Sequence, residues 1–232
     1  MDYWHYYTNR WGIFSKINIM QLIIVGAGSF GREVYTWLTQ TIGKNKDYLI
    51  KGFIDNHLDN QKILRQKKYP VKLIGNINDY FPKPKERLIV SIADTNIRKK
   101  IVTLMLRRGA KFYTLIHPST IIGKNVFIGQ GCIICPNCIL SNDSKIGDYT
   151  IINTSSNIGH DVEVGNFNSI LPMTAIMGNS KTDTACTIGS NVTIIPKIKV
   201  GMNAIVGSGS VVIRNVAKNT SIFGNPAKKI GK

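Results

Sequence analysis

The chain has 232 residues, enough for one large domain or two modest ones, and its apolar content of 43% is that of a globular protein. No apolar stretch reaches the roughly 18–20 residues that a membrane-spanning helix needs, and residues 1–19 do not resemble a signal peptide. The net charge is +17, but the basic residues are scattered without a nucleic-acid-binding motif. We therefore expect a cytoplasmic protein that binds neither membrane nor nucleic acid. Its charge attracts small polyanionic substrates or reflects a compositional bias.

The first predicted element is a buried strand at residues 21–25 (QLIIV). Residues 1–19 precede it, and we expect them to form an extension outside the fold that contributes nothing to catalysis. The glycine-rich segment 26–31 (GAGSFG) follows the strand at once and leads into a helix that continues through Leu38. A GxGxxG motif between strand and helix allows a tight turn whose backbone N–H groups face an anion. Taken by itself, the motif also fits an ordinary turn that packs a helix on a strand.

A second strand at residues 49–54 ends in Asp55 and Asn56, where a Rossmann fold places an acidic residue against a ribose or a base. A strand, a helix and a final strand follow, predicted at residues 88–92, 96–107 and 112–115. Alternating strands and helices indicate a parallel sheet that binds its ligand at the carboxyl ends of the strands. Residues 20–115 are therefore predicted to form a small Rossmann-like domain that binds a nucleotide.

From Ile122 to Val212 an aliphatic residue recurs every six residues, with a mostly small residue four positions after it. Such a period indicates a solenoid. Short strands joined by tight turns, three to a coil, give coils of eighteen residues that stack about 4.8 Å apart. We predict a parallel β-helix over residues 116–220, followed by a tail at 221–232. Its three aliphatic ladders begin Ile122–Leu140–Ile158, Ile128–Ile146–Val164 and Ile134–Ile152–Ile170.

Thr182 interrupts this aliphatic series. Because the count of six is kept through residues 179–185, we interpret the segment as a locally bulged strand that flanks a cleft. A core that tolerates one threonine would give the same pattern.

Cys132, Cys135 and Cys138 form a CxxCxxC run of the kind that can bind a metal. Cys132 and Cys138, like Cys186, fall on the small inward position of the hexad, where cysteine acts as a small apolar residue. Only Cys135 lies off that position, and no fourth ligand is near it. We therefore expect no metal site, and reduced thiols suit a cytoplasmic protein.

His160 is the candidate general base. It follows Ile158 by two positions, at a predicted outward turn, and Asp161 beside it could orient the imidazole. One coil of eighteen residues further on lies Gly178, whose backbone N–H could stabilise an oxyanion. An exposed histidine at a turn can also be merely solvated. His117, at the start of the first coil, is interpreted as a structural junction or cap.

A catalytic role for His160 is supported by the resemblance of several segments to a known family. They are the hexads, the runs NTSS at 153–156 and IGHDVEVG at 158–165, the opening IHPS at 116–119 and the terminal GNPAK at 224–228. These segments resemble the left-handed β-helix acyltransferases. Joined to the N-terminal GAGSFGRE, they resemble the NeuD/PglD-like sugar acetyltransferases over residues 20–232.

The resemblance implies a homotrimer that binds acetyl-CoA between neighbouring β-helices and a nucleotide-linked amino sugar on the N-terminal domain. Carried over, it makes His160 the general base, Asp161 its acidic neighbour and Gly178 the oxyanion donor, and it implies the following binding residues: Gly28, Ser29, Gly31, Asp55, Asn56 and Asn96 for the nucleotide sugar; Ser169, Met177, Gly178, Gly189 and Gly207 for the cofactor. Some members have a second histidine where this chain has Ser169, which puts that contact with CoA in doubt.

We therefore expect an acetyl-CoA-dependent N-acetyltransferase. Its substrate would be a dTDP- or UDP-linked 4-amino-4,6-dideoxy sugar for cell-surface polysaccharide, attacked directly and without a metal. The alternative within the class is O-acetylation of sialic acid or another sugar hydroxyl. From other classes, an NAD-dependent oxidoreductase with a β-helical tail lacks a hydride-transfer site after Asp55, and a γ-carbonic-anhydrase-like enzyme needs three histidine ligands that the repeat does not supply. A non-catalytic binding module would leave the spacing of His160 and Gly178 to chance.

Overall fold

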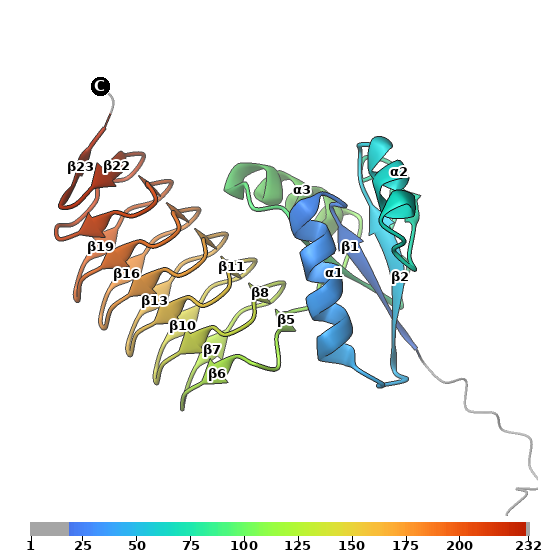
Figure 1. Cartoon of the computed structure of the whole chain (residues 1–232), viewed down its shortest axis with the longest axis horizontal. Helices are drawn as coiled ribbons and strands as arrows, with labels where there is room; N and C mark the ends of the chain where they lie inside the picture. The colour runs from blue at the N-terminus through green and yellow to red at the C-terminus, as the bar shows by residue number, and fades with distance from the viewer. Residues whose placement is uncertain (1–18, 231–232) are drawn as a thin grey trace, which may run out of the picture.

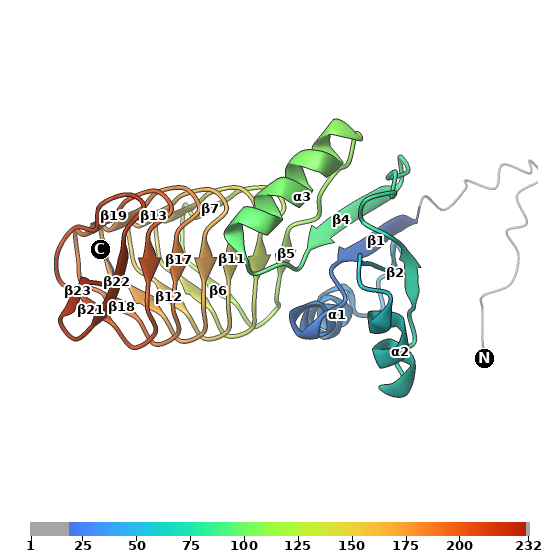
Figure 2. The same cartoon turned by 90° about the horizontal axis from the view of Figure 1, so that it is seen from above.

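The computed structural model describes residues 19–230, which form an α/β domain packed against a long stack of coils (Figure 1). Almost all of the expected extension at 1–19 thus lies outside the described residues. The α/β domain has a parallel sheet in the order β3-β2-β1-β4, with α1 and α2 on one face and α3 on the other (Figure 2). Its elements are β1 (Met20–Val25), α1 (Ser29–Ile42), β2 (Tyr48–Ile54), α2 (Asp59–Gln66), β3 (Leu73–Gly75), β4 (Glu86–Val90) and α3 (Thr95–Arg107).

The structure confirms the parallel sheet, its first three predicted strands and both predicted helices, with boundaries shifted by a few residues at most. Two elements, α2 and β3, were not predicted from the sequence. Leu64 is the buried residue of α2, and β3 has no fully buried residue, so neither shows a clear apolar period. The strand predicted at 112–115 is wrong. Phe112 makes a single bridge to Leu88, and Leu115 already pairs with Ile133 of the β-helix, because the chain leaves the sheet there.

The glycine-rich turn between β1 and α1 requires two of its glycines. Gly26 has φ +99, a region that L side chains rarely adopt. A Cβ on Gly31 would overlap the carbonyl oxygen of Gly26. The helix can therefore begin close against the strand only with glycine at both positions.

The described residues from Leu115 on form a left-handed parallel β-helix with three flat faces, whose strands pair in parallel except for β23. The six-stranded face contains β6 (Ile121–Ile122), β9 (Ile139–Leu140), β12 (Asn157–Ile158), β15 (Ala175–Ile176), β18 (Thr193–Ile194) and β21 (Val211–Val212). The five-stranded face contains β7 (Phe127–Ile128), β10 (Lys145–Ile146), β13 (Glu163–Val164), β16 (Lys181–Thr182) and β19 (Lys199–Val200). The eight-stranded face contains β5 (Leu115–Ile116), β8 (Ile133–Ile134), β11 (Ile151–Ile152), β14 (Ser169–Ile170), β17 (Thr187–Ile188), β20 (Ile205–Val206), β22 (Ser221–Gly224) and β23 (Ala227–Lys229).

The register confirms the predicted ladders. Ile158 pairs with Leu140 on one side and Ile176 on the other, each eighteen residues away. At the turns, a residue with positive φ recurs every six residues, as at Asn125 (φ 57), Asp143 (φ 62) and Asp161 (φ 58). Asparagine and aspartate tolerate this left-handed conformation better than most residues, which suits them to these turns.

Thr182 departs from the prediction in one respect. The strand β16 pairs regularly with β13 and β19, so the predicted bulge is absent. Thr182 is a buried core residue, and the backbone keeps its register because a hydroxyl can replace a methyl group without changing the shape of the side chain.

Residues 221–229, predicted as a tail, continue the fold. The strand β22 pairs with β20, and β23 pairs antiparallel with β22. The two domains also share a core, since one apolar cluster contains Leu38 of α1 together with Leu115 and Cys135. No helix within residues 19–230 is long and apolar enough to cross a bilayer.

Candidate active site

His160 lies at the corner where the chain passes from the six-stranded to the five-stranded face, between β12 and β13. The left-handed turn at Asp161 directs the imidazole outward, and the side chain is 64% exposed. Gly178 occupies the same corner one coil further on. A Cβ on Gly178 would lie 2.5 Å from His160 Nε2 and 2.6 Å from Cε1. The structure therefore confirms the adjacency predicted from the eighteen-residue coil.

The second ring nitrogen of His160 is held by its neighbour. Nδ1 lies 2.8 Å from Oδ2 of Asp161. An ionised carboxylate only accepts hydrogen bonds, so Nδ1 carries the proton in this contact, and in the neutral imidazole the lone pair is then on Nε2. This arrangement leaves Nε2, which lies over Gly178, free to accept a proton from a substrate.

Gly178 also supplies an available donor at this corner. Among residues 19–230 its backbone N–H has no hydrogen-bond acceptor, whereas the next N–H, of Asn179, donates to the carbonyl oxygen of His160 at 3.0 Å. Met177, predicted to contact the cofactor, lies beside it with 41% of its surface exposed. An exposed imidazole, a free amide and an exposed apolar side chain thus share one corner.

The predicted nucleotide-binding residues lie together at the carboxyl edge of the parallel sheet. Gly28 ends the β1–α1 turn, Ser29 and Gly31 lie in the first turn of α1, Asp55 and Asn56 follow β2, and Asn96 lies in the first turn of α3. A Cβ on Gly28 would meet no atom within 4 Å, so the backbone there is open to a ligand. The residues are brought together because all strands of this sheet are parallel.

Asp55 has a structural role that the sequence did not predict. Its side chain is buried and accepts hydrogen bonds from the N–H groups of Ala27 (2.7 Å) and His57 (2.8 Å) and from Asn60 Nδ2 (2.9 Å). The carboxylate therefore fixes the glycine-rich turn against β2. Arg32, which the sequence analysis also missed, donates to Ala27 O and Ser29 Oγ of the same turn, at 3.2 Å each.

A cleft of about 350 Å³ separates the start of α3 from the eight-stranded face. One wall is formed by residues 93–96, including the predicted substrate residue Asn96. The opposite wall includes Leu171, Thr187 and Asn203 of the β-helix. The edge predicted to bind the nucleotide therefore opens directly onto the β-helix.

Ser169, predicted to contact the cofactor, lies in the wall of this cleft and is 1% exposed. Its hydroxyl donates to Ala93 O and accepts from Arg98 Nη1 at 2.9 Å. Both of its observed partners, Ala93 and the buried Arg98, thus belong to the N-terminal domain. Burial of a charged side chain gives no signal in a single sequence, which is why Arg98 was missed.

Gly189 and Gly207, also predicted to contact the cofactor, lie at another corner, where the chain passes from the eight-stranded to the six-stranded face. A Cβ on Gly207 would lie 2.5 Å from Cδ2 of Phe223, and one on Gly189 would lie 2.5 Å from the backbone nitrogen of Ser208. Both glycines therefore permit close packing within the chain. One copy does not bring them together with His160.

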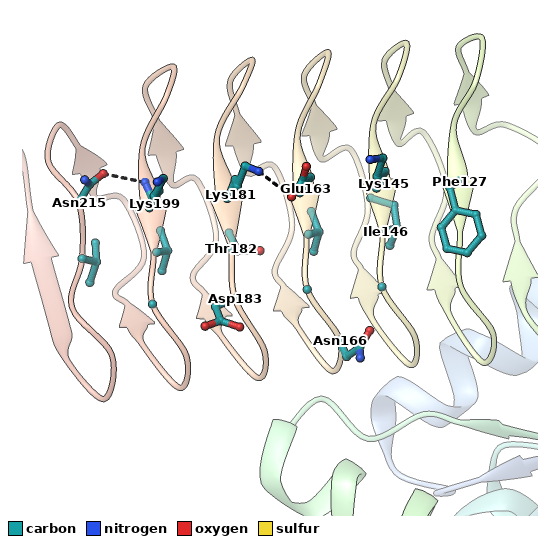
Figure 3. A pocket seen from close by; sticks show the side chains of 16 residues that line it. Phe127, Lys145, Ile146, Glu163, Asn166, Lys181, Thr182, Asp183, Lys199 and Asn215 are labelled. Atoms are coloured by element: carbon teal, nitrogen blue, oxygen red, sulfur yellow. Dashed lines mark hydrogen bonds and ion pairs between the residues drawn. The ribbon is translucent and has the colours of Figure 1, made fainter.

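A groove of about 690 Å³ runs along the five-stranded face (Figure 3). Lys145, Glu163, Lys181 and Lys199 form one wall, and Lys181 Nζ donates to Glu163 Oε2 at 2.9 Å. Thr182 also lines the groove, so the cleft expected beside it is present although its strand is regular.

The four cysteines are buried and unpaired. Burial raises the pKa of Cys132 to about 12 and that of Cys138 to about 11. It also raises the pKa of Cys135, the cysteine that does not occupy the inward hexad position. All four are therefore thiols at neutral pH. Among residues 19–230 no three histidine, cysteine or acidic side chains are grouped as metal ligands.

Comparison with known proteins identifies the family. Residues 21–105 match the model of the PglD N-terminal domain. GDP-perosamine N-acetyltransferase of Escherichia coli O157:H7 is 30% identical over 211 residues, which cover 87% of this chain and 81% of that protein. This chain belongs to the PglD-like family of acetyl-CoA-dependent sugar N-acetyltransferases.

Two solved structures of PglD-like relatives extend over nearly the whole chain. WeeI from Acinetobacter baumannii AYE has a TM-score of 0.80 at 26% identity and covers 91% of this chain and 100% of its own. PerB from Caulobacter crescentus, in complex with CoA and GDP-perosamine, has a TM-score of 0.77 at 25% identity and covers 91% and 97%. The predicted fold, family and acetyl-CoA dependence are thus confirmed.

Proposed function

We propose that this chain transfers acetyl from acetyl-CoA to the amino group of a nucleotide-linked 4-amino-4,6-dideoxy sugar, with His160 as general base. The observation that carries this proposal is the free Nε2 of His160 over Gly178, with Nδ1 held by Asp161. The amine nitrogen attacks the thioester carbonyl, and Nε2 takes the proton that the nitrogen loses. The Gly178 N–H stabilises the oxyanion, which collapses with cleavage of the C–S bond, and the departing CoA thiolate takes back the proton held by His160 Nε2.

The nucleotide can be decided by experiment. The sequence suggested dTDP or UDP, whereas the relative from Escherichia coli is named for GDP-perosamine and PerB from Caulobacter crescentus was solved in complex with it. Purified protein would be assayed with acetyl-CoA and GDP-perosamine, UDP- and dTDP-4-amino-4,6-dideoxy sugars, and free sialic acid. We expect release of CoA with one of the nucleotide-linked amines. Release with sialic acid alone would establish O-acetylation instead.

We further propose that the active site is completed between copies in a homotrimer, with acetyl-CoA between neighbouring β-helices. In one chain, His160 lies at the six-to-five corner, whereas the N-terminal domain contacts the turns at Tyr149 and Phe167, between the five-stranded and eight-stranded faces. The five-stranded face therefore lies between the base and the nucleotide edge. A sugar bound by one copy reaches the His160 of another more readily than its own.

A mixing experiment tests this assembly. The variants His160→Ala and Gly31→Val are each expected to be inactive, because they remove the base and the nucleotide turn respectively. Co-expressed, they should recover part of the activity if base and nucleotide edge come from different copies, and none if one copy supplies both. Light scattering would give the number of copies. We place the enzyme in the cytoplasm, in a step of cell-surface polysaccharide synthesis, which suits its unpaired thiols.

A further inference from the structure

Arg98, in the first turns of α3, is buried between the two domains. Its side chain is 1% exposed and is among the largest fully buried side chains of residues 19–230. Burying a guanidinium removes its hydration, so each donor must find a partner in the protein. The partners of Arg98 come from both domains.

On the side of the N-terminal domain, Arg98 Nη1 donates to Ile92 O at 2.6 Å and to Ala93 O at 3.0 Å. These carbonyl groups belong to the loop that links β4 to α3. The same loop continues through Asp94 into the first turn of α3 with Asn96, and both residues line one wall of the 350 Å³ cleft. The guanidinium therefore bonds to the backbone of the loop that forms this wall.

On the side of the β-helix, Arg98 donates to the carbonyl oxygens of three turn residues. They are Tyr149 (2.9 Å, from Nε), Phe167 (2.8 Å) and Asn168 (2.9 Å, both from Nη2). Nη1 also donates to Ser169 Oγ at 2.9 Å. Tyr149 and Phe167 stack with ring centroids 5.0 Å apart, so these turns present a rigid set of carbonyl groups.

The contacts of Arg98 are with neutral oxygens. No carboxylate among residues 19–230 forms an ion pair with it. Burial lowers the pKa of Arg98 to about 10, so the guanidinium stays protonated at neutral pH. Five N–H donors in a fixed planar fork match several carbonyl groups at once, which a lysine ammonium cannot do. The contact is thus specific in geometry as well as in charge.

We infer that Arg98 is a positioning residue that fixes the acceptor-binding loop, residues 91–96, against the β-helix, so that its loss impairs acetyl transfer between bound substrates rather than binding of either one. The catalytic part of this inference rests on the proposed function. The part that concerns the loop does not rest on it, because the contact joins the loop to the β-helix and involves no substrate. Misplacing an acceptor by about 1 Å can cost about 10²-fold in rate.

Arg108 offers a matched control. It lies at the other end of α3 and donates to the carbonyl oxygens of Ile77 (3.2 Å), Asn78 (2.6 Å) and Tyr80 (3.0 Å). All three belong to the N-terminal domain, so Arg108→Met removes similar bonds without touching the β-helix. Arg98→Met and Arg98→Lys are the test variants.

The first measurement is hydrogen exchange of residues 91–96 in the full chain. Arg98→Met is expected to speed exchange in this loop at least tenfold, and Arg108→Met is expected to leave it unchanged. Arg98→Lys should be intermediate, because its ammonium has three donors. Unchanged exchange in both Arg98 variants would overturn the inference. If Arg98→Met does not fold, Arg98→Lys gives the same comparison.

The second measurement separates binding from transfer. Dissociation constants are measured by calorimetry for coenzyme A and for GDP, UDP and dTDP, and kcat is measured with the accepted sugar. In Arg98→Met, the dissociation constants are expected to stay within about threefold of the wild-type values, while kcat falls about 10²-fold. A loss of nucleotide affinity as large as the loss of kcat would show direct binding and overturn positioning. If the wild-type protein acetylates none of the sugars, the proposed function fails, and the exchange result still decides whether Arg98 fixes the loop.

Discussion

The imidazole of His160 lies against Gly178 of the next coil, with the position of a Gly178 Cβ only 2.5 Å from Nε2. Gly178→Ala should therefore displace the ring from its hydrogen bond with Asp161. We expect kcat to fall about 10²-fold, the usual cost of misplacing a reacting group by about 1 Å. The β-helix should stay folded, because the added methyl group meets an exposed side chain. In the His160→Ala background the same change should cost little, and an equal loss there would contradict this explanation.

His160→Ala removes the proposed base. We expect kcat to fall about 10²–10⁴-fold with an unchanged melting temperature, since the side chain is exposed. His117→Ala is the control. His117 bonds Ser119 Oγ at 2.7 Å and Gln40 Oε1 at 2.8 Å, which ties the first coil to α1 as the predicted junction. That variant should lose stability but retain turnover. A His160→Ala enzyme with wild-type kcat would exclude the mechanism.

Thr182→Val should stabilise the protein. Among residues 19–230 the buried Oγ1 of Thr182 has no hydrogen-bond partner, and valine has nearly the same shape. Removing an unsatisfied buried hydroxyl should raise the free energy of unfolding by about 1 kcal/mol, or about 2–4 °C in melting temperature for a chain of this length. Calorimetry measures the shift. A lower melting temperature would mean that the hydroxyl has a partner.

Glu86 should make the N-terminal domain acid-sensitive. Burial alone would raise the pKa of Glu86, but the hydrogen bonds from Lys51, the Lys83 N–H and Tyr80 outweigh it and lower the pKa below its usual value. The stability from the charged form is complete above the unfolded pKa of about 4.3 and is lost as pH falls through the folded pKa.

Urea denaturation between about pH 7 and pH 3 tests this dependence. Glu86→Gln should be less stable by about 2 kcal/mol at neutral pH and should lose less stability on acidification than the wild type. Parallel curves for the two proteins would show that Glu86 does not contribute.

Much of the site followed from the repeat. A constant eighteen-residue coil converts sequence separation into position, which placed Gly178 against His160 and put Cys132 and Cys138 in the core. The parallel order of strands likewise gathered Gly28, Asp55 and Asn96 at one edge. Each of these inferences needed only local geometry repeated along the chain.

The sequence did not predict what happens between the two domains. The resemblance implied that Ser169 contacts the cofactor, yet its hydroxyl bonds to Ala93 and Arg98. The charge of Arg98 is buried against carbonyl groups 51–70 residues away along the chain. Asp55 fits a ligand contact in the sequence but fixes a turn in the structure.

The sequence by itself thus determined the two architectures and the corner that brings His160 and Gly178 together, because periodicity and glycine-rich turns act over a few residues. Only the tertiary structure decided how the carboxyl edge of the parallel sheet is held on the β-helix. That contact joins chain segments with no common period, and its stability comes from pairing buried polar groups, which depends on the folded arrangement of both domains.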